Sequence, residues 1–234
     1  FISLEMSQLE LCDRLLCSAA RVNGHKMRNG TISNEDRAKL VEKAGELASA
    51  PLYVDDSPTR TVSEIASAAR RIQRTHNGHL GLIVIDYLQL IEPDNARDPR
   101  QEQVARIARR LKGLARDLKV PVLCLAQLNR QAEGSADHRP KLSHLRESGA
   151  IEQDADVVMF IHREEYYRRG EDAEQFAGLA EIIIAKQRNG PVGEIEVLWQ
   201  KDFTRFVDKA PERLQAFDDF NSGAESGVAN GDPF

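Results

Sequence analysis

The most informative hydrophobic pattern along this chain is an uninterrupted apolar run that ends in one carboxylate. Leu82 to Ile85 are four branched apolar residues, and Asp86 follows them directly. A short run without polar alternation is typical of a strand that is covered on both faces, as in a parallel sheet. Because a buried strand cannot easily hold a carboxylate in its middle, we expect Asp86 at the carboxyl end of the strand. In open α/β sheets, ligands bind at that edge.

Helical patterns lie on both sides of this run. Ser7 with Glu10 and Thr61 with Glu64 have the spacing of capping boxes, and Ser33 is placed to cap another helix. In a fourth helix the apolar residues alternate spacings of three and four, which predicts one buried face: Val104, Ile107, Leu111, Leu114 and Leu118.

Two of these helices have a less regular apolar pattern. In the helix that starts at Ser7 we expect an inward face of Leu9, Cys12, Leu16 and Ala19. In the helix that starts at Ser33 the expected face is Leu40, Val41, Ala44, Leu47 and Ala48.

The remaining apolar runs predict short strands between the helices. We expect them at residues 1–4, 51–54, 82–85, 120–126 and 156–161, and the runs at 181–186 and 194–199 are joined as a hairpin. Residues 129–149 are expected to be a long polar loop, and 164–174 an exposed excursion. Strands that alternate with helices predict an α/β fold, with a mostly parallel sheet flanked by helices and a terminal antiparallel hairpin.

The domain organisation follows from the change in composition near the end of the chain. Residues 1–217 read as one domain, and 218–234 are rich in Gly, Ser, Asn and acidic residues and are expected to be a disordered tail. The first residue is Phe1 and the chain starts on an apolar run, so we expect a fragment of a longer protein.

Composition and charge are those of an ordinary globular protein, with 41% hydrophobic and 29% charged residues. The sequence has no apolar run of about 20 residues and no signal peptide, and its three cysteines are expected to be buried, reduced thiols, so we expect a cytoplasmic protein. The formal net charge is −5, so any contact with nucleic acid has to come from local loops. None of the six histidines has metal-ligand spacing with a cysteine or another histidine.

Polar side chains suited to phosphate chemistry follow three of the expected strands. Glu5 follows residues 1–4, Asp86 follows 82–85, and Gln127 follows 122–126. In a parallel sheet the three strand ends share one edge. There one carboxylate can orient an attacking water, another can hold Mg²⁺ through water, and an amide can bind the γ-phosphate of ATP. For each residue alone a solvated loop position is the simpler interpretation; the joint pattern favours a function.

Arg188 lies near the tip of the expected hairpin, and Lys186 is two residues earlier. Residues i and i+2 of a strand face the same way. The hairpin is either an ordinary exposed turn, or it presents an arginine that stabilises charge on a transferring phosphoryl group. A projecting hairpin of this kind can reach the site of a neighbouring subunit, and head-to-tail contacts can close a ring.

Five stretches together resemble the carboxyl-terminal ATPase domain of the DnaB-type replicative DNA helicases. They are Phe-Ile-Ser-Leu-Glu-Met-Ser (1–7), Ile-Val-Ile-Asp-Tyr-Leu-Gln-Leu-Ile (83–91), Pro-Val-Leu-Cys-Leu-Ala-Gln-Leu-Asn-Arg (121–130), Leu-Arg-Glu-Ser-Gly-Ala-Ile-Glu-Gln-Asp-Ala-Asp (145–156) and Ala-Lys-Gln-Arg-Asn-Gly-Pro-Val-Gly (185–193). The resemblance covers most of the chain in the family's order. It implies a RecA-like fold, ATP and Mg²⁺ as cofactors, single-stranded DNA as a ligand and a ring of six subunits. In the full-length protein it also implies primase and a helicase loader as partners.

The resemblance also implies a role for each matching residue. Glu5 resembles the catalytic glutamate, Asp86 the Walker B aspartate, and Gln127 the glutamine that links the γ-phosphate to the DNA-binding loops. Lys186 and Arg188 resemble the pair that enters the neighbouring nucleotide site. The residues that match the loop in contact with the DNA backbone are Arg146, Glu147 and Gly149.

One motif of the family is missing from the sequence. Residues 1–234 contain no G-x-x-x-x-G-K-[ST] loop and no Gly-Lys pair. Backbone amides and the lysine of that loop cradle the phosphates, and the family places it before the position of Phe1. We therefore expect residues 1–234 alone to hydrolyse ATP poorly. Two alternatives stay open, a RecA-like recombinase or repair ATPase, and a non-catalytic remnant that binds DNA or a partner.

Overall fold

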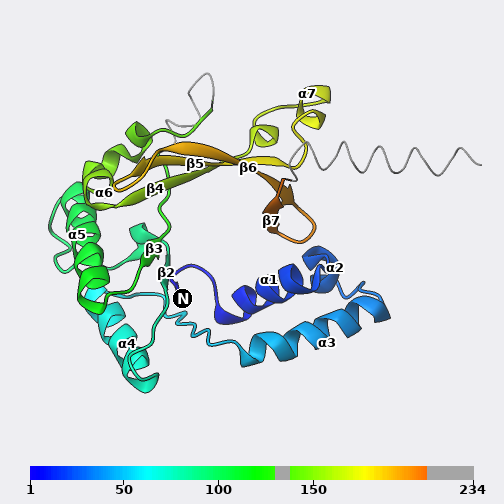
Figure 1. Ribbon diagram of the computed structural model, residues 1–234, viewed down its shortest axis with the longest axis horizontal. Coiled ribbons are helices and arrows are strands. Elements are labelled where there is room, and N and C mark those ends of the chain that lie inside the picture. Colours follow the sequence, from blue (N-terminus) through cyan, green and yellow to red (C-terminus); the bar gives the residue numbers. More distant parts are fainter. Residues whose placement is uncertain (130–137, 210–234) are drawn as a thin grey trace, which may run out of the picture.

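A computed structural model of the chain describes residues 1–129 and 138–209, without the side chains of residues 146–148 and 171–172. The expected tail at 218–234 and the expected domain boundary at residue 217 lie outside the described residues. Figure 1 shows an antiparallel sheet above a group of helices, with a small parallel sheet between these helices and α5 (Arg100–Leu118) at the left.

The parallel sheet has three strands in the order β1-β2-β3. They are β1 (Ile2–Ser3), β2 (Ile83–Asp86) and β3 (Val122–Cys124). Ser3 is opposite Asp86, and Ile85 is opposite Cys124. The expectation that Asp86 ends its strand is therefore confirmed.

The strand expected at residues 51–54 is wrong. Only one bridge forms in this region, between Ile2 and Asp55. Pro51 has no N–H to donate, and the N–H of Leu52 donates to the carbonyl of Ala50 in a local turn at 2.8 Å. The segment therefore meets β1 mainly through the backbone of Asp55, with one further contact from the amino group of Phe1 to the carbonyl of Tyr53 at 2.7 Å.

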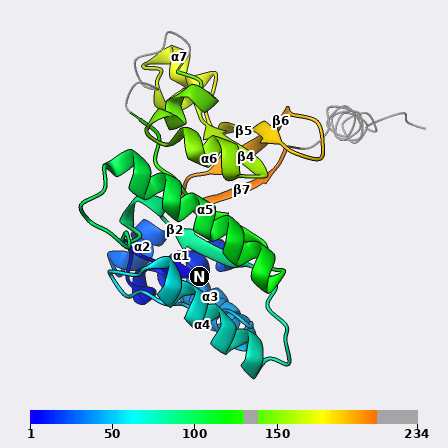
Figure 2. The same cartoon turned by 90° about the vertical axis from the view of Figure 1, so that its left-hand side faces the viewer.

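Two helices cover the parallel sheet and form the main core with it. They are α4 (Val62–Thr75) and α5 (Arg100–Leu118), and the short turn η1 (Leu88–Leu90) follows β2. All five apolar residues predicted to face inward from α5 are buried, and the capping box of Thr61 with Glu64 is present. Figure 2 shows α5 lying across β2. The regular three-four spacing was therefore a reliable guide to the buried face.

The helices α1 (Gln8–Ala20), α2 (Gly24–Arg28) and α3 (Asn34–Ser49) form a second layer, and the predicted caps at Ser7 and Ser33 are present. The predicted inward face of α1 is wrong except at Leu16, which packs on the cluster around Cys17, and the predicted face of α3 is correct at Leu40 but wrong at Val41. Leu9 is 72% exposed, Cys12 and Ala19 are exposed, and Val41 is 69% exposed, whereas the buried residues are Leu11, Cys17, Ala20 and Leu40. Apolar residues surround most of α1, so their spacing does not define a single face.

The second sheet is antiparallel and has the order β4-β5-β6-β7. Its strands are β4 (Val157–His162), β5 (Leu179–Gln187), β6 (Gly193–Gln200) and β7 (Arg205–Asp208). The predicted hairpin is confirmed as β5 and β6. The strand expected at 156–161 forms as β4, but the sequence predicts only the hairpin as antiparallel, whereas β4 also pairs antiparallel with β5. Its burial alternates residue by residue, as in a sheet with one covered face.

Short helical elements connect the two sheets. The expected polar loop at 129–149 is wrong over its second half, where η3 (Leu142–Ser148) leads into α6 (Gly149–Asp154). The excursion after β4 contains η4 (Glu164–Tyr166) and α7 (Glu171–Glu174). Among the described residues, no helix has the length and apolar character needed to cross a membrane.

The two faces of α1 give a direct test of this packing. Leu11→Ala removes a side chain that is 8% exposed, and we expect it to lower the free energy of unfolding by about 2–4 kcal/mol. Leu9→Ala is the matched control on the same helix, and we expect a change within about 0.5 kcal/mol. Urea-induced unfolding followed by circular dichroism measures both values. A larger loss for Leu9→Ala than for Leu11→Ala would contradict the structure.

Candidate functional site

The carboxyl ends of β1, β2 and β3 lie at one edge of the parallel sheet. Past the strands the pairing continues, since the N–H of Leu4 donates to the carbonyl of Asp86 at 2.8 Å and that of Leu125 to Ile85 at 2.9 Å. Asp86 is the last residue of β2, and Glu5 and Gln127 follow shortly after the ends of β1 and β3. The structure therefore brings the three predicted strand-end residues to the same edge.

A tight turn holds Glu5 at this edge. The Ser3 hydroxyl, in a residue that is 1% exposed, donates to the carbonyl of Met6 at 2.6 Å. On the far side of the turn, the backbone N–H of Gln8 donates to a carboxylate oxygen of Asp56 at 2.8 Å. Both ends of the turn are fixed, whereas Glu5 itself is exposed. This suits a carboxylate that has to meet a water molecule and a ligand.

Gln127 is held by a residue that the sequence interpretation missed. The side-chain amide of Gln89 donates to the carbonyl of Gln127 at 3.0 Å, and its oxygen accepts the N–H of Gln127 at 3.2 Å. Gln89 is itself fixed through its carbonyl, which accepts from Arg100 at 2.6 Å. The two hydrogen bonds constrain the Gln127 backbone and leave the Gln127 side chain available. Only the fold brings residues 89 and 127 together, so sequence spacing gave no signal.

Cys124 lies on β3 beside the β2 residues that lead to Asp86. Burial, and secondarily the Asp86 carboxylate, raise the pKa of the Cys124 thiol to about 12. The neutral thiol therefore adds no charge near Asp86. Cys12, Cys17 and Cys124 are all free, but the expectation that all three are buried is wrong because Cys12 is exposed.

The predicted pair on the hairpin contacts α6. The Lys186 ammonium donates to the carbonyl of Glu152 and, at 3.3 Å, to that of Gln153. A terminal nitrogen of Arg188 donates to the same Gln153 carbonyl at 3.3 Å. The prediction that the two side chains face the same way is therefore confirmed. The carbonyls of Glu152 and Gln153 are at the carboxyl end of α6, which is the negative end of the helix dipole, so the positive charges of Lys186 and Arg188 are attracted to it.

Arg188 has a second partner in Asp156. The Nε of Arg188 lies 3.2 Å from Oδ1 of Asp156, and its backbone N–H donates to the Asp156 carbonyl at 2.8 Å. Among the contacts of the described residues, Lys186 and Arg188 touch α6 and Asp156 rather than Glu5 or the other strand-end residues. The structure thus places the hairpin pair and the strand-end residues in two separate clusters within one chain.

The three residues predicted to contact DNA lie at the junction of η3 and α6. Arg146 and Glu147 are in η3, and Gly149 is the exposed first residue of α6. The opposite end of α6 supplies the carbonyls that hold Lys186 and Arg188. One short helix therefore separates the predicted DNA loop from the arginine hairpin.

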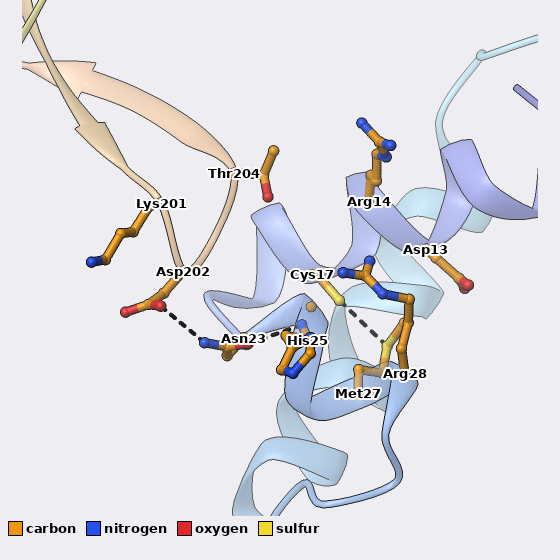
Figure 3. Close-up of a pocket in the computed structure, with 11 residues that line it drawn as sticks. Asp13, Arg14, Cys17, Asn23, His25, Met27, Arg28, Lys201, Asp202 and Thr204 are labelled. Atoms are coloured by element: carbon orange, nitrogen blue, oxygen red, sulfur yellow. Dashed lines mark hydrogen bonds between the residues drawn. The ribbon is translucent and has the colours of Figure 1, made fainter. Parts of the chain in front are cut away.

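A pocket of about 130 Å³ opens between α1, α2 and the turn that joins β6 to β7 (Figure 3). Its wall includes Arg14, Cys17 and Arg28, and a 3.0 Å hydrogen bond from Asn23 to Asp202 closes one side. None of the predicted site residues lines it. Segments distant in the sequence form its walls, so it could not be found from the sequence alone.

The strand-end edge offers few side chains that could bind a metal ion. Among residues 1–129 and 138–209, no cluster of three or more His, Cys, Asp or Glu side chains is placed to hold a metal ion. Mg²⁺ is usually bound through one or two carboxylates, water and substrate phosphates. A single aspartate at the end of β2 fits that chemistry.

The fold is RecA-like, and the similar solved structures include an ATPase domain and a DnaB-like replicative helicase. One of them, described as an ATPase domain, is 39% identical, with a TM-score of 0.84, and the match covers 89% of this chain and 73% of that one. A structure titled "The Structure Of A DnaB-Like Replicative Helicase And Its Interactions With Primase" is also 39% identical, with a TM-score of 0.84, and the match covers 89% of this chain and 50% of that one.

Residues 1–208 match the family model described as "DnaB-like helicase C terminal domain", and the chain belongs to this family. It is 46% identical over 207 residues to the replicative DNA helicase DnaB of Geobacillus stearothermophilus, a match that covers 88% of this chain and 44% of that protein. It is 44% identical over 207 residues to the replicative DNA helicase DnaC of Bacillus subtilis (strain 168), with the same coverage. The chain thus spans less than half the length of these relatives, and the resemblance inferred from the five stretches is confirmed.

The role of Gln89 can be tested by hydrogen exchange. Gln89→Ala removes the acceptor of the Gln127 N–H, and we expect exchange of that amide to accelerate about fivefold, as for the loss of one hydrogen bond. Gln73→Ala is the control, since the Gln73 amide donates to the carbonyl of Leu118 at 3.2 Å, away from Gln89 and Arg100. Equal exchange of the Gln127 amide in all three proteins would contradict the proposed constraint.

The raised pKa of Cys124 predicts slow alkylation. Because burial disfavours the thiolate, the reactive form at pH 8 is about 10⁻⁴ of the total, and labelling by iodoacetamide should rise about tenfold per pH unit from pH 7 to 9. The exposed Cys12 should be labelled first. Peptide mass spectrometry distinguishes the sites, and in urea all three should react alike. Rapid labelling of Cys124 in the folded protein at pH 7 would contradict the raised pKa of its thiol.

Proposed function

We propose that this chain is the ATP-hydrolysing motor domain of a replicative DNA helicase that unwinds duplex DNA at replication forks. The observation that supports it most directly is the convergence of Glu5, Asp86 and Gln127 at one edge of the parallel sheet. The names of its relatives, replicative DNA helicases, support the same function. Because the chain spans less than half the length of those relatives, the activity is proposed for the whole protein that carries these residues.

In this proposal each strand-end residue has one task. Asp86 would hold Mg²⁺ through water, Glu5 would orient the attacking water and accept its proton, and Gln127 would bind the γ-phosphate, with ADP as the leaving group. The Gln89 amide fixes the backbone of Gln127, so the Gln127 side chain is the part that is left to respond to the phosphate. Bound ATP supplies the phosphoryl group, and Mg²⁺ neutralises its charge.

In this proposal the phosphate-binding loop is supplied by residues outside 1–234. β3 is an outer strand of the described parallel sheet. Leu123 on β3 and Leu125 just after it are partly exposed. On β4, the alternate residues Val157, Met159 and Ile161 are exposed as well. These apolar surfaces are suited to further core elements, such as the strand and helix that accompany a phosphate loop.

The hairpin and the DNA loop act between subunits in this proposal. Lys186 and Arg188 enter the nucleotide site of the next subunit in a homo-hexameric ring and stabilise charge on the transferring phosphoryl group. Arg146, Glu147 and Gly149 contact the backbone of single-stranded DNA in the ring centre. Six subunits with a few contacts each bind DNA despite the net charge of −5. In the complete protein, primase and a helicase loader are the further partners, and its location is the cytoplasm.

Two other functions are less well supported. Membership of the DnaB-like helicase family argues against a RecA-like recombinase or repair ATPase. A non-catalytic remnant that binds DNA or a partner is favoured only by the absence of a phosphate loop within residues 1–234. A Gly-Lys-Thr or Gly-Lys-Ser sequence encoded about 30 residues upstream would restore the enzyme.

The proposal is tested by alanine variants in the complete gene product that carries these residues. We expect Glu5→Ala, Gln127→Ala and Arg188→Ala each to lower DNA-stimulated ATP hydrolysis by about 10²-fold or more and to abolish fork unwinding. Glu102→Ala and Arg71→Ala, at exposed helix positions, are the controls. The fold should be retained in all variants by circular dichroism.

Mixing experiments test the transfer of Arg188 between subunits. Arg188→Ala subunits keep their own strand-end residues, and Glu5→Ala subunits keep an intact hairpin, so mixed rings should recover ATP hydrolysis that neither variant shows alone. Full activity of Arg188→Ala without mixing would refute the role of the hairpin. Full activity of Glu5→Ala would refute the role of the strand-end edge.

A further inference from the structure

The hairpin that carries Arg188 contains an irregularity that sets the direction of its side chains. Val158 pairs with Lys186 but Met159 pairs with Ile184, so Ala185 is an extra residue on β5. Such a β-bulge redirects the side chains that follow it. Ile183 and Ala185 pack on the cluster around Val158 and Phe160, and simple alternation would send Lys186 to the opposite face. The bulge instead brings Lys186 to the side where α6 lies.

The end of α6 then receives both cations. Lys186 contacts the carbonyls of Glu152 and Gln153, and Arg188 contacts that of Gln153. Ile151 of α6 packs into the same cluster as Val158. The helix is therefore fixed against the sheet that carries the hairpin, and its carbonyls are fixed reference points for the two side chains.

Asp156 completes this arrangement from the segment between α6 and β4. Its Oδ1 lies 3.2 Å from Nε of Arg188, and its Oδ2 accepts from the ammonium of Lys112 on α5. The backbone carbonyl of Asp156 also accepts the N–H of Arg188 at 2.8 Å. One residue thus fixes both the backbone and the side chain of Arg188 and connects them to the helix that covers the parallel sheet.

The charge state of Asp156 suits this position. The hydrogen bond from Lys112 lowers the pKa of Asp156, with added attraction from Lys112, Arg188 and Lys186, and outweighs the opposing effect of burial. The carboxylate is therefore ionised at neutral pH. Its side chain is 49% exposed and that of Arg188 is 52% exposed, so the ion pair contributes little to stability. Its effect is on the orientation of the guanidinium.

We propose that Asp156 is a positioning residue that orients Arg188 for entry into the nucleotide site of a neighbouring subunit. This inference rests on the proposed function of Arg188. A long arginine side chain loses many rotamers when it meets a phosphoryl group in one geometry. Holding it near that geometry beforehand removes part of this cost, and a displacement of about 1 Å can lower a rate about 10²-fold.

The first measurement needs no nucleotide. In the complete gene product, phenylglyoxal should modify Arg188 several-fold faster in Asp156→Ala than in the parent protein, because the guanidinium has lost its carboxylate partner; peptide mass spectrometry gives the rate. Asp154→Ala is the matched control, since Asp154 pairs with Arg109 on α5 at 3.9 Å and lies two residues away. An unchanged rate at Arg188 in Asp156→Ala would overturn the inference.

The second measurement is kinetic. We expect Asp156→Ala to lower kcat for DNA-stimulated ATP hydrolysis about 10- to 100-fold, with KM for ATP within about twofold, because Arg188 acts on the transition state of the neighbouring site. Asp156→Glu should restore part of kcat, and Asp154→Ala should keep it. Adding Asp156→Ala to Arg188→Ala should cause no further loss, because Asp156 acts through Arg188.

The outcomes separate this inference from the function on which it rests. If Arg188→Ala is inactive while Asp156→Ala keeps the parental kcat, the positioning role is wrong and the arginine hairpin stands. If Arg188→Ala is fully active, the proposed function of the hairpin fails and the inference fails with it. Asp156→Ala subunits should also recover activity when mixed with Glu5→Ala subunits, and a failure to recover would show that Asp156 does not act between subunits.

Discussion

The parallel register of β1, β2 and β3 is the constraint on which the rest of the structure depends. Ser3 is opposite Asp86, and Ile85, which is fully buried, is opposite Cys124. Side chains alternate along a strand, so a slip of one residue would turn Asp86 to the other face and expose Ile85. The apolar run at residues 82–85 therefore determines where the Asp86 carboxylate lies. The backbone hydrogen bonds that continue past the strand ends keep the segments that lead to Glu5 and Gln127 in the same register.

The helix α5 connects the parallel sheet to the segment that precedes the second sheet. Its buried residues pack on the parallel sheet, and on its polar side Arg109 and Lys112 pair with Asp154 and Asp156. These two aspartates flank the junction between α6 and β4. An amphipathic helix thus uses its apolar face to cover the parallel sheet and its charged face to place the segment that holds the arginine hairpin.

Local signals predicted much of this arrangement, whereas long-range pairing was not predictable. The caps at Ser7, Ser33 and Thr61, the buried face of α5 and the hairpin depend on residues close in the sequence, and all were predicted. The buried face of α1 was not, because apolar residues lie around most of that helix, and of the face predicted for α3 only Leu40 is buried. β4 has the same apolar content as a parallel strand, and only its partner β5 decides its direction. The same distinction holds for the candidate site. The strand-end residues were predicted from their residue type and their position after an apolar run. Gln89 and Asp156 were missed because each acts through a contact with a residue distant in the sequence.

The contacts of Arg188 are compatible with a partner outside the chain. A guanidinium has five N–H donors, and the contacts with Asp156 and Gln153 involve Nε and one terminal nitrogen. Both partners lie on the side of α6, and about half of the Arg188 side chain remains exposed. A planar group held along one side presents its remaining donors in a fixed direction, which favours bidentate recognition of a phosphoryl group. The same contacts that hold Arg188 within its own chain therefore orient it toward an anion on another.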